Sequence, residues 1–143
     1  MRTAPCLVFA CVMTATAVAQ QPPVESTVTV PQVHKTKIIP ASGVIFDVGG
    51  ETPKTTEQWT VISNAGVALA ESGNLMMRVS PPKDRTKWIT LSRQLATAGR
   101  AARKAAEAKN VGALMRTSDR LIIACETCHA TFRTQATVAR TSE

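Results

Sequence analysis

The chain is poor in aromatic residues and in cysteines. It has no tyrosine, two tryptophans and three phenylalanines among 143 residues, while alanine is abundant. Side chains of this kind favour thin helices that pack closely. Of the four cysteines, Cys6 and Cys11 lie in an apolar N-terminal stretch, which leaves Cys125 and Cys128 for the rest of the chain. Such a pair cannot build the several disulfides that hold small secreted domains together.

Strand patterns and a nucleic-acid signature are also missing. Apolar and polar residues do not alternate over any useful length, so we expect no strands. Lys and Arg outnumber Asp and Glu by 17 to 10, which gives a formal net charge of +7. Because these basic residues do not interleave with aromatics, we expect no nucleic-acid partner. A basic surface favours an acidic partner protein or an anionic membrane surface.

Residues 1–19 have the organisation of a secretory signal peptide. Arg2 supplies the positive charge, residues 7–18 are mostly apolar, and a small-x-small cleavage site ends at Ala19. The apolar stretch is too short for a permanent membrane anchor. We therefore expect export, cleavage after Ala19 and no integral membrane segment in the mature chain. The alternatives are lipid attachment at Cys11 and a first helix of the fold.

Apolar residues recur at helical spacing along four segments, which follow a flexible, Pro-rich and polar lead-in at 20–29. The predicted helices span about 31–48, 56–77, 85–108 and 110–134. Their predicted N-caps are Thr55 or Thr56 for the second helix, Asp84 for the third and Asn110 for the fourth. Pro40 lies inside the first helix and predicts a kink or a local break. Short connections make neighbouring helices antiparallel. The sequence thus predicts one all-α domain over 30–143, an antiparallel up-down-up-down four-helix bundle.

The strongest chemical signal is Cys125-Glu126-Thr127-Cys128-His129 on the fourth predicted helix. This is C-x-x-C-H, the attachment signature of a c-type haem. Its spacing places both thiols on one side of a helix, where they can form thioether links to the haem vinyl groups. His129 follows directly and can bind the iron as proximal ligand. Both cysteines fall on the buried stripe, which predicts one covalent haem c inside the bundle.

Three other interpretations of the motif stay open. A thioredoxin-like redox pair needs a βαβ context, and none is visible in the sequence. A structural zinc site needs four ligands, and the processed chain would offer only Cys125, Cys128, His129 and His34. Adjacent Cys128 and His129 would be awkward ligands for one tetrahedral ion. The spacing can also arise by chance.

A C-x-x-C-H on the last helix of a four-helix bundle resembles the class II c-type cytochromes, which are the cytochrome c-prime family and its low-spin relatives. The similarity covers about residues 31–133. It includes the Phe132-Arg133 pair, which the resemblance places at the haem, and the runs Ile38-Ile39-Pro40-Ala41-Ser42 and Leu69-Ala70-Glu71-Ser72-Gly73-Asn74-Leu75. Arg133 could pair with the haem propionates or be solvated. The resemblance also implies a homodimer through the first two helices.

The distal ligand departs from the family pattern. Low-spin members usually place a Met on the first helix, about two turns before such a Pro, whereas this chain has His34, six residues before Pro40. His34 lies on the apolar side and is the only histidine besides His129, so we expect it as the sixth ligand. The alternatives are a half-buried histidine that does not touch iron, or another distal residue among Met76, Met77 and Met115.

These features predict a periplasmic electron carrier that works with redox partner proteins, because bacterial haem attachment takes place outside the cytoplasm. With His129 and His34 as ligands, the coordination of Fe(III) and Fe(II) would be nearly the same. The alternative is a high-spin protein of the cytochrome c-prime kind that binds NO or CO at an open distal position. No acid–base constellation is visible, so we expect no enzyme. Trp59 and Trp88 could flank the porphyrin, but core positions are the simpler interpretation.

Overall fold

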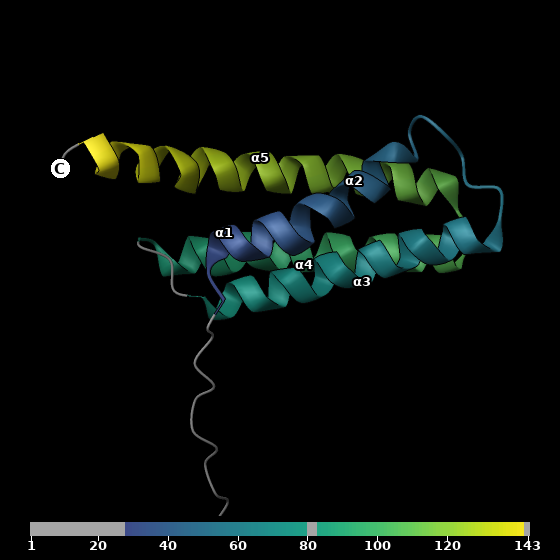
Figure 1. Cartoon of the computed structure of the whole chain (residues 1–143), viewed down its shortest axis with the longest axis horizontal. Helices are drawn as coiled ribbons and strands as arrows, with labels where there is room; N and C mark the ends of the chain where they lie inside the picture. The colour runs from purple at the N-terminus through teal and green to yellow at the C-terminus, as the bar shows by residue number, and fades with distance from the viewer. Residues whose placement is uncertain (1–27, 80–82, 142–143) are drawn as a thin grey trace, which may run out of the picture.

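The computed structural model describes residues 28–79 and 83–141, with side chains described as far as Phe132. The predicted signal peptide, most of the lead-in and the side chain of Arg133 lie outside the described residues. Within the described ranges every regular element is a helix and there is no strand, as predicted. Four helical columns pack together (Figure 1).

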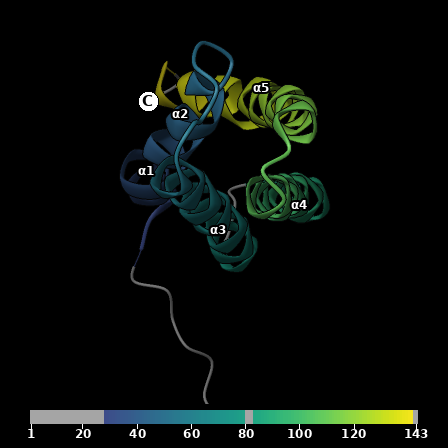
Figure 2. The same ribbon diagram turned by 90° about the vertical axis from the view of Figure 1, so that its right-hand side faces the viewer.

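The first column contains three consecutive elements, and each of the others is a single helix. It begins with α1 (Val30–Val33), continues as the π-helix η1 (His34–Ile38) and ends with α2 (Ile39–Asp47). The other columns are α3 (Thr56–Arg78), α4 (Arg85–Glu107) and α5 (Val111–Thr141). Contacts run in a ring, from α2 to α3, to α4, to α5 and back to α2 (Figure 2).

Side-chain caps fix where the helices begin. Thr55 and Gln58 form a capping box at the start of α3, and the Asp84 side chain accepts the amide of Lys87 at the start of α4. The Asn110 side chain accepts the Ala113 amide at 2.8 Å. These caps satisfy amides that have no partner within the helix. The predicted N-cap positions at Asp84 and Asn110 are confirmed, and of the two threonines considered for α3 the cap is Thr55.

Pro40 distorts the first column without breaking it. The chain passes through the π turn η1 just before Pro40 and then continues as the α-helix α2. The buried residues on either side of the turn are five apart, since Val33 is 0% and Ile38 4% exposed. Residues five apart share a face only in a turn that is wider than the α-helix. The predicted local break is therefore a change of helical register.

Small residues bring α3 and α4 into backbone contact. A Cβ atom added to Gly66 would lie 2.5 Å from the backbone nitrogen of Arg103, and one added to Gly73 would lie 2.5 Å from that of Ala96. A Cβ on Gly99 would collide with the backbone of Ala70. The core around this contact is aliphatic and alanine-rich, and its fully buried large side chains include Ile45, Leu69, Leu114 and Leu121. No helix of the described part is both long and apolar enough to cross a bilayer.

The glycine contact predicts a change of sign between two Gly→Ala substitutions. Gly99→Ala should lower the free energy of unfolding by about 1–3 kcal/mol, because α3 and α4 must separate to admit the methyl group. Gly43→Ala in α2 is the matched control, since nothing lies within 4 Å of its added Cβ. That variant should be neutral or more stable by about 0.5–1 kcal/mol. Urea unfolding of both variants tests this, and equal effects would contradict the close packing.

Candidate functional site

The C-x-x-C-H motif lies in the middle of α5, where this helix faces the interior of the bundle. Cys125 and Cys128 are half-buried free thiols that pack against the hydrophobic core. His129 follows them and is exposed. The helix thus places the two thiols at the core and the imidazole at its edge. This is the arrangement that the spacing of the motif predicts for a helix.

His34 of η1 comes to the same place from the other end of the sequence. Its ring centroid is 5.5 Å from that of His129, and the two ring planes are inclined by 36°. These are the only two histidines of the chain. Residues 95 positions apart therefore meet, because η1 and α5 belong to columns that neighbour each other in the ring of helices.

A small cavity joins the two histidines to the two cysteines. Its volume is about 30 Å³. The remaining lining residues come from the first column, α3, α4 and α5 and are mostly apolar: Ile38, Met76, Leu91, Ser92, Leu95 and Ala124. All four of the motif and distal residues predicted from the sequence thus surround one apolar space.

The separation of the two rings suits two imidazoles that bind one metal ion from opposite sides. Imidazole nitrogens bind metals at about 2 Å, so the two ring centroids would then lie roughly 6 Å apart. A haem brings four nitrogen ligands of its own and needs only axial ligands from the protein. In the described ranges no group of three or more His, Cys, Asp and Glu side chains is placed to hold a metal ion. Two facing imidazoles are the donor set that a haem iron would need from the protein.

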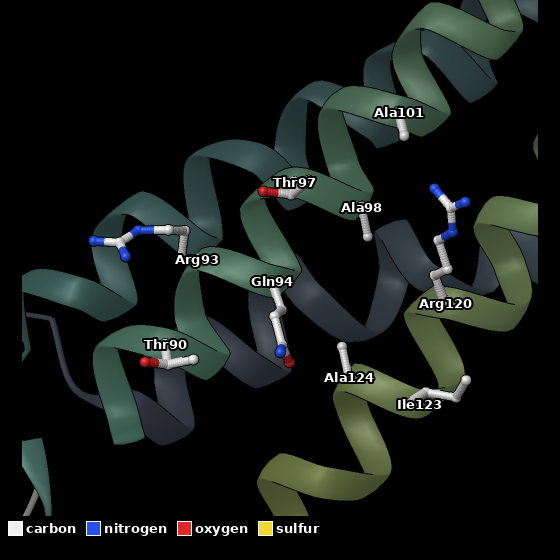
Figure 3. A pocket seen from close by; sticks show the side chains of 9 residues that line it. All are labelled: Thr90, Arg93, Gln94, Thr97, Ala98, Ala101, Arg120, Ile123 and Ala124. Carbon is white, nitrogen blue, oxygen red and sulfur yellow. The ribbon is translucent and has the colours of Figure 1, made fainter. Parts of the chain in front are cut away.

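The enclosed space is smaller than the group it would receive. Pockets for organic ligands usually measure about 300–1,000 Å³. A larger groove of about 430 Å³ lies beside the cavity, between α4 and α5, and both are lined by Ala124 (Figure 3). Ala98 of α4 and Ala124 of α5 face each other across this groove. Next to the cysteines α4 and α5 are therefore less closely packed than α3 and α4, whose backbones are in contact.

Burial sets the protonation of the site residues. It lowers the pKa of His34, and the charge of His129 nearby lowers it further. The neutral imidazole that results is the form that binds metals. Burial raises the pKa of Cys125 and, in the second place, the neighbouring Glu126 raises it too. Burial likewise raises the pKa of the Cys128 thiol, with Cys125 as the lesser cause. Redox-active C-x-x-C pairs instead have a lowered thiol pKa.

The remaining candidates for the distal position are placed differently. Met76 is buried and lines the cavity, whereas Met77 and Met115 do not line it. Sequence reasoning did not single out Ser92, which is buried at the cavity wall and has no motif around it. It also did not foresee the π turn that carries His34, although the five-residue gap between Val33 and Ile38 was a signal for it.

Trp88 and Phe132 pack against each other close to the site. Their rings meet edge to face with centroids 5.0 Å apart. The indole N–H of Trp88 donates to the carbonyl of Met76 at 2.6 Å, within the last turn of α3. That carbonyl has no partner within its own helix. Trp88 thus connects the last turn of α3 and the first turn of α4 to α5. Trp59 is also buried in the core, so both tryptophans occupy the core positions that were expected.

Comparison with known proteins returned no match, whether against family models, curated proteins or solved structures.

The Trp88 contact predicts a stability difference between two similar substitutions. Trp88→Phe should lower the free energy of unfolding by about 1–3 kcal/mol more than the lost apolar area explains, because the Met76 carbonyl is left without its donor. Trp59→Phe is the matched control, since its indole makes no such hydrogen bond to another helix among the described residues. Denaturant unfolding of the two variants compares them. Equal losses would show that the bond has no net effect.

Proposed function

We propose that this protein is a mono-haem c-type cytochrome that transfers electrons. One observation carries the proposal: the only two histidines of the chain face each other beside both cysteines of the C-x-x-C-H motif. A haem held there would supply a one-electron Fe(III)/Fe(II) couple. Cys125 and Cys128 would tether its vinyl groups, and His129 and His34 would be the axial ligands.

The chain contributes a fixed environment for that couple. Two neutral imidazoles favour the low-spin state in both oxidation states, so little has to move when an electron arrives. The apolar lining from Ile38, Leu91 and Leu95 would limit the access of water to a metal held there. We expect Phe132 and Arg133 near the haem edge, with Arg133 able to pair with a propionate. The four columns contact one another in chain order, and short connections between them would give the expected antiparallel up-down-up-down order.

The site geometry favours this function over gas binding. An NO- or CO-binding protein needs an open distal position, and here the His34 ring, with its centroid 5.5 Å from that of His129, would occupy that position. A periplasmic location and redox partner proteins follow from the proposal, because covalent attachment in bacteria takes place after export. A homodimer through the first two helices belongs to the same proposal. The excess of basic residues would suit an acidic redox partner.

Covalent attachment is the first property to test. Haem should stay on the polypeptide through denaturing electrophoresis and acid-acetone extraction, because thioether bonds survive both treatments. Cys125→Ala and Cys128→Ala should each leave a single thioether, and the double variant should lose the stain. Thr127→Ala, which changes an exposed residue between the two cysteines, is the control and should keep it. Haem that leaves the wild-type chain would rule out a c-type cytochrome.

The role of His34 is tested by two substitutions with opposite expectations. His34→Met should stay low-spin with a higher reduction potential, since a Met/His ligand pair raises the potential. His34→Ala should become high-spin and bind CO. Lys35→Ala, at the exposed neighbouring residue, is the matched control and should leave the optical spectrum and the potential unchanged. If His34→Ala also leaves both unchanged, His34 is not a ligand and the gas-binding function is favoured.

A further inference from the structure

The proposed distal ligand, His34, is the first residue of the π turn η1. At its end the Ile39 amide donates to the carbonyl of His34, five residues back, where an α-helix would bond four residues back. Single π turns inside α-helices are rare, and those that occur often lie at functional sites. The turn therefore has a physical cause in the sequence and an effect on the position of His34.

Pro40 is the physical cause of the wide turn. In an α-helix the Thr36 carbonyl would receive the amide of residue 40, but proline has no N–H and its ring would clash with that carbonyl. A π turn relieves the clash, because its hydrogen bonds join residues that are five apart rather than four apart. The Thr36 hydroxyl also donates to the Gln32 carbonyl at 2.8 Å, a type of bond that often bends helices.

The consequence is a rotation of the segment that carries His34. The buried residues of α2 and the residue before it, namely Ile38, Ala41, Ile45 and Val48, follow the three- and four-residue spacing of an α-helix. Continued backwards in that register, the middle of the stripe would fall on His34. Val33 would then lie on the order of 100° away, because each residue turns an α-helix by that angle.

The structure shows the opposite arrangement. Val33 is completely buried, whereas His34 is only half-buried and its ring contacts His129 of α5. The wide turn thus puts Val33 into the middle of the stripe and moves His34 to the flank that faces α5. Without it, the imidazole would lie at the middle of the stripe, where Val33 lies in the structure.

We propose that Pro40 is a positioning residue for the distal ligand, because it enforces the π turn that directs His34 toward His129. This inference rests on the proposed haem ligation by His34. It adds that ligation by residue 34 requires both a histidine at that position and the helical register that directs its side chain toward His129.

Replacement of the proline tests the proposal in the haem-containing protein. Pro40→Ala should let the segment return to the α register and withdraw His34 from the iron. The oxidised spectrum should then become high-spin, and the affinity for CO should rise by about tenfold or more as the open form becomes dominant. Pro31→Ala is the matched control, since Pro31 lies at the start of α1, where no amide partner is lost. It should keep the wild-type spectrum.

A compensating deletion separates positioning from general damage. Deletion of the exposed Lys37 in the Pro40→Ala background places Val33 four residues and His34 three residues before Ile38. In a regular α-helix these spacings restore the buried Val33 and the flanking His34. The low-spin spectrum should return. If Pro40 has only a structural role, the deletion should lower the free energy of unfolding further and the low-spin spectrum should not return.

The outcomes distinguish this inference from the proposed function. A low-spin spectrum in Pro40→Ala, or no recovery after the Lys37 deletion, overturns the positioning role while the ligation by His34 stands. If His34→Ala has no effect on the spectrum, the ligation has failed. In that case nuclear Overhauser contacts between the His34 and His129 rings report the register of the helix. These contacts should be present in the wild type and lost in Pro40→Ala. Contacts that persist in Pro40→Ala overturn the inference.

Discussion

The approach of His34 to His129 is the constraint on which the rest of the site depends. It joins the first column to α5, two parts of the bundle that are remote in sequence. The two cysteines share the cavity with both rings, so one space holds every group that a covalent haem would use. Burial lowers the pKa of His34, which favours the neutral imidazole that binds metals, and raises the pKa of both thiols, whereas redox-active C-x-x-C pairs have a lowered one.

The packing of the bundle is uneven. Glycines let α3 and α4 touch through their backbones, so this pair of helices is closely packed. Between α4 and α5 a groove of about 430 Å³ remains, with Ala98, Ala101 and Ala124 in its lining, so these two helices pack less closely beside the motif. A large flat group that inserts next to Cys125 would therefore displace α5 rather than the tightly packed pair α3 and α4.

The sequence was sufficient to locate the helices, but it was not sufficient to predict the change of helical register at η1. Apolar spacing and caps at Asp84 and Asn110 located the four columns, because these signals are local. The π turn depends on a clash between Pro40 and a carbonyl four residues earlier, and from the sequence Pro40 predicted only a kink or a local break. The motif identified Cys125, Cys128 and His129 by their type and spacing. That His34 meets His129 depends on long-range packing, and its binding to iron stays a prediction, as do the roles of Phe132 and Arg133.

Electron paramagnetic resonance of the oxidised protein, combined with ¹⁵N labelling of histidine, tests the central claim most directly. Because the chain has only two histidines, each labelled nitrogen that couples to the iron can be counted. The account predicts a low-spin Fe(III) haem with two coupled imidazole nitrogens, one from His129 and one from His34. A high-spin signal, or a low-spin signal with a single coupled imidazole, would contradict it.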